Sequence, residues 1–109
     1  MMSQLILISQ RKIDGLIIKT IENVLMEIFG ELPLTYILQG MKEKFNLVVN
    51  DAPSEPRAFS RALREILGKN SVIIEDLILE NLYLNLEIRY KLEEGYNFSD
   101  YIRDLREQS

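Results

Sequence analysis

Three arginines recur at the spacing of one helix face in the middle of the chain. Arg57, Arg61 and Arg64 are separated by one turn each, and Lys69 follows just beyond them. A planar guanidinium group can donate two parallel hydrogen bonds to a phosphate or a carboxylate. We therefore treat these four residues as candidates for binding a partner or a phosphate. The alternative is a solvated face in which Arg61 pairs with Glu65, and this alternative is favoured.

Carboxylates are the other residues that could support chemistry. Glu75, Asp76 and Glu80 are predicted on the outer side of one helix, and two carboxylates can act as acid and base or bind magnesium. No second acidic motif or glycine-rich phosphate loop accompanies them. A solvated acidic face is therefore the favoured interpretation.

Histidine and cysteine are both missing from the sequence. Their lack excludes serine and cysteine triads, disulfides and most zinc or iron sites. We expect a protein that is not an enzyme, with no catalytic residue, cofactor, metal or small-molecule substrate.

Four of the five tyrosines lie in the last third of the chain. Aromatic residues are common at interfaces, but a half-buried structural role is favoured for this group. The group comprises Tyr83, Tyr90, Tyr96 and Tyr101.

The elements that must position these residues are helices. A chain of 109 residues with 47% hydrophobic content is the size of a single domain, here residues 1–109. Apolar residues recur with a period near 3.6, which predicts a mainly α fold, a small bundle of four to five helices. The predicted helices cover residues 12–29, 33–45, 56–67, a stretch that begins near 71, and a last helix capped by Asn97.

Glycine and proline mark the ends of these helices. Gly30 and Gly68 are expected to stop the first and third helices, and Pro56 to open the third. Asn70 or Ser71 could cap the fourth. Gly40 interrupts the second helix, which we attribute to close approach of a neighbouring helix.

The hydrophobic pattern changes period after residue 82. Residues 82–92 alternate between apolar and polar, which is typical of a strand, although a helix continuing through residues 85–94 to Gly95 is also compatible. We favour a break near Asn85. The extended segment 86–92 could then pair with residues 5–9 in a short two-stranded β ribbon.

Two rows of apolar side chains, in residues 5–8 and 86–92, have no evident cover within such a small helical protein. Because a two-stranded ribbon alone is marginal in water, we expect the rows to pair across a two-fold axis in a homodimer. The candidate residues for self-association are Leu5, Leu7, Leu86, Ile88 and Tyr90.

The chain shows no sign of a membrane segment. Its longest wholly aliphatic run, residues 5–8, is much shorter than the roughly 20 residues of a spanning helix. The first four residues lack the basic flank of a secretory signal, so a cytoplasmic protein is expected. A net charge of -4 disfavours broad nucleic-acid binding without excluding a local basic face.

The helix punctuation resembles that of a known family. The stretches Ile28 to Glu31, Pro56 to Gly68, and Ile73 to Tyr83 are similar to the Nitrosopumilus output domain family of small archaeal helical signal-output domains. The similarity covers residues 13–83, and residues 84–109 form a C-terminal extension. The resemblance implies a binding module in signal transduction with no enzymatic activity, and it assigns no catalytic residue.

Two hypotheses about function follow. The first is a small cytoplasmic protein-interaction or signal-output module that binds a protein partner or itself through apolar and helix surfaces. The second is a DNA-binding regulator of helix-turn-helix type that uses the arginine face of the third helix. The net acidity and the long connector before that helix favour the first.

Overall fold

The computed structural model describes residues 9–108, and within them the chain forms five α-helices and one short 3-10 helix. The helices confirm the mainly α bundle expected from the sequence. In chain order they are α1 (Gln10–Phe29), α2 (Glu31–Phe45), η2 (Val49–Asp51), α3 (Pro56–Leu67), α4 (Asn70–Asn85) and α5 (Phe98–Glu107).

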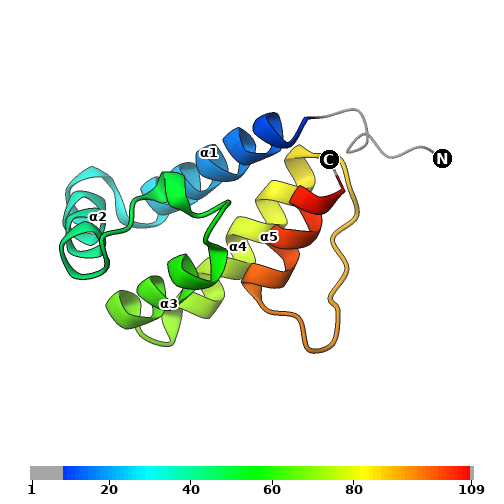
Figure 1. The fold of residues 1–109 in the computed structure, drawn as a ribbon. Helices are drawn as coiled ribbons and strands as arrows, with labels where there is room; N and C mark the ends of the chain where they lie inside the picture. Colours follow the sequence, from blue (N-terminus) through cyan, green and yellow to red (C-terminus); the bar gives the residue numbers. More distant parts are fainter. Residues whose placement is uncertain (1–8, 109) are drawn as a thin grey trace.

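Helices α4 and α5 form the centre of the bundle. Helix α1 packs against both of them on one side and α3 packs against both on the other, as Figure 1 shows. Helix α2 contacts α1 and α3 and projects at one end of the molecule. This arrangement places the outer side of α3 next to the N-terminal half of α5, where the candidate site lies.

The core is made of aliphatic and aromatic side chains from every α-helix. Helix α2 contributes least, because Leu34 and Met41 are its only buried side chains. The largest fully buried side chains are Ile13, Ile17, Ile21, Leu25, Met41, Phe59, Leu63, Ile78, Leu79, Leu82 and Ile102.

The helix ends predicted at Gly30, Pro56 and Gly68 are confirmed, whereas α2 begins at Glu31 and not at the predicted residue 33. Gly30 has φ 80° and Gly68 has φ 68°, a backbone conformation that side chains with a Cβ rarely adopt, and Pro56 is the first residue of α3. The interpretation of Gly40 is wrong. A Cβ built at Gly40 would meet no atom within 4 Å among the described residues, so no neighbouring helix requires a glycine there.

Helix α4 ends at Asn85, which confirms the predicted break. The amide of Ile88 donates to the carbonyl of Tyr83 and the amide of Glu87 donates to that of Leu84, the paired hydrogen bonds of a Schellman motif. Glu87 adopts the left-handed conformation, with φ 57°, that this motif requires. A glutamate rather than a glycine therefore terminates the central helix.

Residues 86–92 form no strand, so this half of the proposed β ribbon is wrong. Leu86 is buried, and Ile88 and Tyr90 pack against the core of the same chain. These side chains are thus covered wholly or in part by the same chain, and the homodimer stays a prediction. Leu5 and Leu7, the other half of that prediction, lie outside the described residues.

The apolar residues of α4 do not all face the core. Ile74 and Ile78 are buried, but Ile73 and Leu84 are exposed, with exposed fractions of 62% and 74%. Helix α4 is apolar on nearly every side, so its periodicity cannot select the buried face. Contacts with α1, α3 and α5 select it instead.

Candidate functional site

The arginines of α3 lie on its exposed side, as predicted. Arg57, Arg61 and Arg64 are all exposed, and none forms an ion pair within 4.0 Å with another described residue. The pair between Arg61 and Glu65, on which the solvated interpretation rested, is not formed. We call Arg57, Arg61 and Arg64 the arginine face.

Two of the cavities that adjoin the arginine face are lined by both Arg57 and Arg61. The larger one, of about 530 Å³, lies between the start of α3 and the exposed side of α5. Its lining includes Arg57, Arg61, Arg103 and Arg106, together with the apolar side chains of Pro53, Pro56 and Ala58.

The smaller cavity, of about 220 Å³, shares Arg57 and Arg61 with the larger one and adds Arg64. Ser60, Glu75, Asn97 and Ser99 complete its lining. The arginine face therefore contributes side chains to both cavities. Lys69, the fourth candidate, lines neither cavity.

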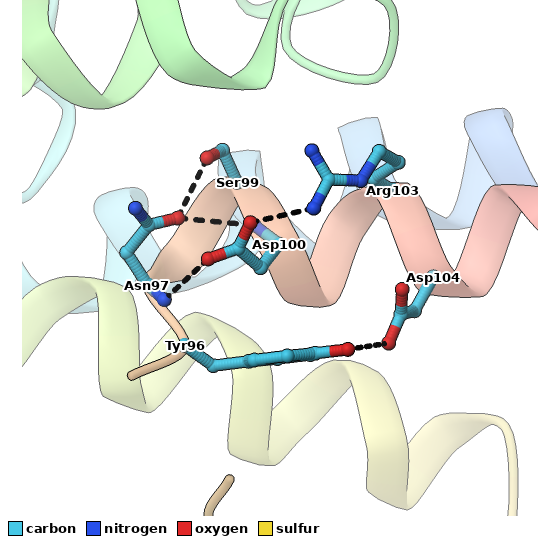
Figure 2. Close-up of polar contacts among 6 residues, drawn as sticks. All are labelled: Tyr96, Asn97, Ser99, Asp100, Arg103 and Asp104. Carbon is cyan, nitrogen blue, oxygen red and sulfur yellow. Dashed lines mark hydrogen bonds and ion pairs between the residues drawn. The ribbon is translucent and has the colours of Figure 1, made fainter. Parts of the chain in front are cut away.

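The first turn of α5 is held by a capping box, shown in Figure 2. The Asn97 side-chain oxygen accepts hydrogen bonds from the Asp100 amide at 3.1 Å and from the Ser99 hydroxyl at 2.6 Å. In return the Asp100 carboxylate accepts from the Asn97 amide at 2.9 Å. These contacts fix the first turn of α5, which lies next to the arginine face.

Asp100 also accepts a hydrogen bond from Arg103 at 2.6 Å. The Asn97 amide first, and then Arg103 and Arg57, hold the pKa of the Asp100 carboxyl below its usual value. Asp100 therefore stays ionised and partly offsets the charge of the nearby arginines. The pair with Arg103 is open to water, since the Arg103 side chain is 51% exposed, so an incoming anion can compete for this guanidinium.

Arg106 has a different role. It donates to both carboxylate oxygens of Asp14, at 2.8 Å and 3.2 Å, and so joins α5 to α1. A bidentate pair of this kind is directional as well as charged. Arg106 thus fixes one wall of the larger cavity.

Glu75 is not on the outer side of α4, where the sequence placed it. It is buried, with an exposed fraction of 8%, and it accepts a hydrogen bond from Ser60 on α3. Burial raises the pKa of the Glu75 carboxyl, although the hydrogen bond and the nearby Arg64 oppose this rise. Glu75 supplies a carboxyl group that links two helices at the edge of the arginine face.

The remaining acidic candidates lie on the surface. Asp76 and Glu80 are exposed on α4. Among residues 9–108 no group of three or more acidic side chains is arranged to hold a metal ion.

The tyrosines form a packed structural cluster. Tyr101 lies at the centre, with ring centroids 6.4, 5.4 and 5.0 Å from those of Tyr83, Tyr90 and Tyr96. The Tyr101 hydroxyl accepts a hydrogen bond from the Glu93 amide at 2.7 Å. Burial raises the pKa of Tyr83 and Tyr90 to about 12, so both stay neutral.

A predicted helix cap is also wrong. Ser71 is fully buried, and its hydroxyl has no hydrogen-bond partner among the described residues. It does not cap α4, since no side chain donates or accepts a capping hydrogen bond at the start of that helix.

Sequence reasoning missed the contribution of α5 to the site. Ser99, Arg103 and Arg106 lie on the last helix, and the spacing of the two arginines indicated a common face. Nothing in the sequence indicated that this face meets α3, because the two helices are about 30 residues apart and joined through α4.

No protein-family model, curated protein or solved structure matches the chain. The resemblance to the Nitrosopumilus output domain family therefore stays a prediction. No helix among the described residues is long and apolar enough to cross a membrane.

Proposed function

We propose that this protein is a small interaction module without catalytic activity, and that its arginine face binds an acidic segment of a partner protein. The observation that carries the proposal is the lack of any ion pair between Arg57, Arg61 or Arg64 and the described residues, although all three share one helix side. Like charges one turn apart on a helix repel one another. An anionic partner would remove this repulsion.

The distribution of charge supports a specific site over a generally basic protein. The sequence has a net charge of -4, yet five of its seven arginines lie on α3 and α5. Those five arginines line the two adjoining cavities. Guanidinium groups gathered in this way suit carboxylates that arrive together on one ligand.

The position of α5 favours a protein partner over DNA. Arg57 and Arg61 line cavities shared with α5, so this side of α3 has α5 beside it. A recognition helix needs to enter a major groove that is about 12 Å wide.

The proposal is tested with a fluorescein-labelled peptide rich in glutamate and aspartate, whose binding is followed by fluorescence anisotropy at low and at physiological salt. We expect saturable binding that weakens with salt. The double variant Arg57→Gln and Arg61→Gln should lose at least about tenfold in affinity.

A matched control removes the same charge elsewhere. Lys42→Gln with Lys44→Gln changes two exposed cations on α2, outside both cavities, and should bind like the parent protein. Equal losses in the two double variants would show that only net charge matters and would contradict the proposal. Tighter binding of duplex DNA of matched charge than of the peptide would also contradict the proposal.

A further inference from the structure

The larger cavity is lined by apolar as well as charged side chains. Pro53, Pro56 and Ala58 contribute apolar surface to it, at the point where the chain enters α3. Its volume of about 530 Å³ lies within the range of roughly 300–1,000 Å³ that is typical of ligand-binding hollows. A surface that bound carboxylates alone would need neither the hollow nor its apolar wall.

The arginines around this hollow are not equivalent. Arg106 is committed to Asp14, and Arg103 is held by Asp100 in a pair open to water. Arg57 and Arg61 have no such ion pair with the described residues and border both cavities. Arg57 and Arg61 are therefore the first anchors for an anion, with Arg103 available through exchange of its partner.

The spacing of the anchors limits the ligand. Residues four apart on a helix have Cβ atoms about 5–6 Å apart. Arg57 and Arg61 can therefore engage two carboxylates that are close together on one chain, while the neighbouring hollow stays open to a third side chain. The hollow accepts an apolar group because burial against the prolines removes that group from water.

The walls of the hollow are fixed before any ligand arrives. The bidentate pair of Arg106 with Asp14 joins α5 to α1, and the capping box of Asn97 with Asp100 orders the first turn of α5. Pro56 restricts the backbone at the first position of α3. A preformed site loses less conformational entropy on binding.

We infer that the partner segment carries closely spaced acidic residues around one large apolar side chain, which enters the hollow between α3 and α5 while the acids contact Arg57 and Arg61. The inference rests on the proposed function for its acidic part. The apolar side chain and its location are additional to that function.

The test compares three labelled peptides of equal length with the full chain. One has acidic residues around a central leucine, the second has serine in place of the leucine, and the third keeps the leucine but carries glutamines in place of the acids. We expect the leucine peptide to bind about tenfold more tightly than the serine peptide, because a buried leucine gains transfer free energy. The glutamine peptide should not bind measurably.

Ala58→Met fills the hollow without changing the charge. It should abolish the preference for the leucine peptide over the serine peptide. Thr35→Met places the same side chain on an exposed position of α2 and should keep the preference. The comparison of peptides on the parent protein needs neither variant, so a folding defect in Ala58→Met leaves the inference testable.

The outcomes separate the inference from the proposed function. Equal binding of the leucine and serine peptides would overturn the inference and leave the acidic site in place, whereas failure of both acidic peptides would overturn the proposed function as well. A dimer in sedimentation that Arg57→Gln dissociates would identify a second copy as the occupant and overturn the inference. Tighter binding of duplex DNA than of the leucine peptide would also overturn it.

Discussion

Ser60 on α3 donates a hydrogen bond to the carboxyl group of Glu75 on α4, and the two residues line the smaller cavity of the arginine face. The pair connects a polar contact inside the bundle to the candidate binding surface. Because Glu75 is buried, its protonation state affects the stability of the fold.

The first prediction concerns pH. Since burial raises the pKa of Glu75 above its ordinary value of 4.5, the folded protein favours the neutral carboxyl. The stabilisation that the neutral Glu75 carboxyl gives to the fold is therefore fully present below pH 4.5, and it is lost as the pH rises through the raised pKa. Glu75→Gln keeps an oxygen for the Ser60 hydroxyl but has no charge. It should be more stable than the parent protein at about pH 8, with the difference closing by about pH 4.

Urea unfolding at these two pH values measures the effect. Glu80→Gln removes an exposed carboxylate from the same helix and should show no comparable dependence on pH. A Glu75→Gln protein that is less stable than its parent at both pH values would show that the ionised form is the favoured one.

The second prediction concerns the core. Leu63 is fully buried in α3, so Leu63→Ala should lower the free energy of unfolding by about 2–5 kcal/mol through the lost transfer energy and the cavity left behind. Leu84→Ala removes the same atoms from a side chain that is 74% exposed, and it should change stability by less than about 0.5 kcal/mol. Denaturant titration measures both variants, and similar losses would contradict the assignment of the core.

The third prediction contrasts two glycines. At Gly40, inside α2, a methyl group meets no described atom within 4 Å, so Gly40→Ala should stabilise the protein by about 1 kcal/mol through helix propensity. Gly30 has φ 80° and ψ 173°, so Gly30→Ala should cost about 1–3 kcal/mol through backbone strain alone. Thermal melts of the two variants should therefore shift in opposite directions.

The fourth prediction concerns the end of the central helix. Glu87 holds a left-handed conformation in the Schellman motif, which costs a residue with a Cβ about 1–2 kcal/mol. Glu87→Gly should therefore raise the free energy of unfolding by about 1 kcal/mol.

Glu80→Gly gives the matched control for this change. It places glycine inside α4, where helix propensity opposes it, and should cost about 1 kcal/mol. Destabilisation by both variants would show that Glu87 contributes more through its side chain than its backbone conformation costs.

Several helix ends could be predicted from the sequence because their signals are local. Asn97 with Asp100, Pro56 and Gly68 act within a turn of their own positions, and each behaves as expected. The arginine face was predicted for the same reason, since residues four apart share a side of any helix.

The burial of Glu75 and the wall supplied by α5 could not be predicted in this way. Helix α4 carries apolar residues on almost every side, so only its neighbours decide that Glu75 faces inward and Ile73 outward. The meeting of α3 with α5 likewise depends on the path of the chain between them. Both features belong to tertiary packing, which periodicity does not encode.

The ion pair of Asp14 with Arg106 spans 92 positions of the sequence and has a consequence for synthesis on the ribosome. Phe98, Ile102 and Leu105 of α5 complete the core against α1, α3 and α4. While α5 is still inside the ribosome, the apolar surface of the earlier helices that it will cover is exposed to water. The complete core therefore forms only after α5 has emerged, and until then the exposed apolar surface of the earlier helices favours aggregation.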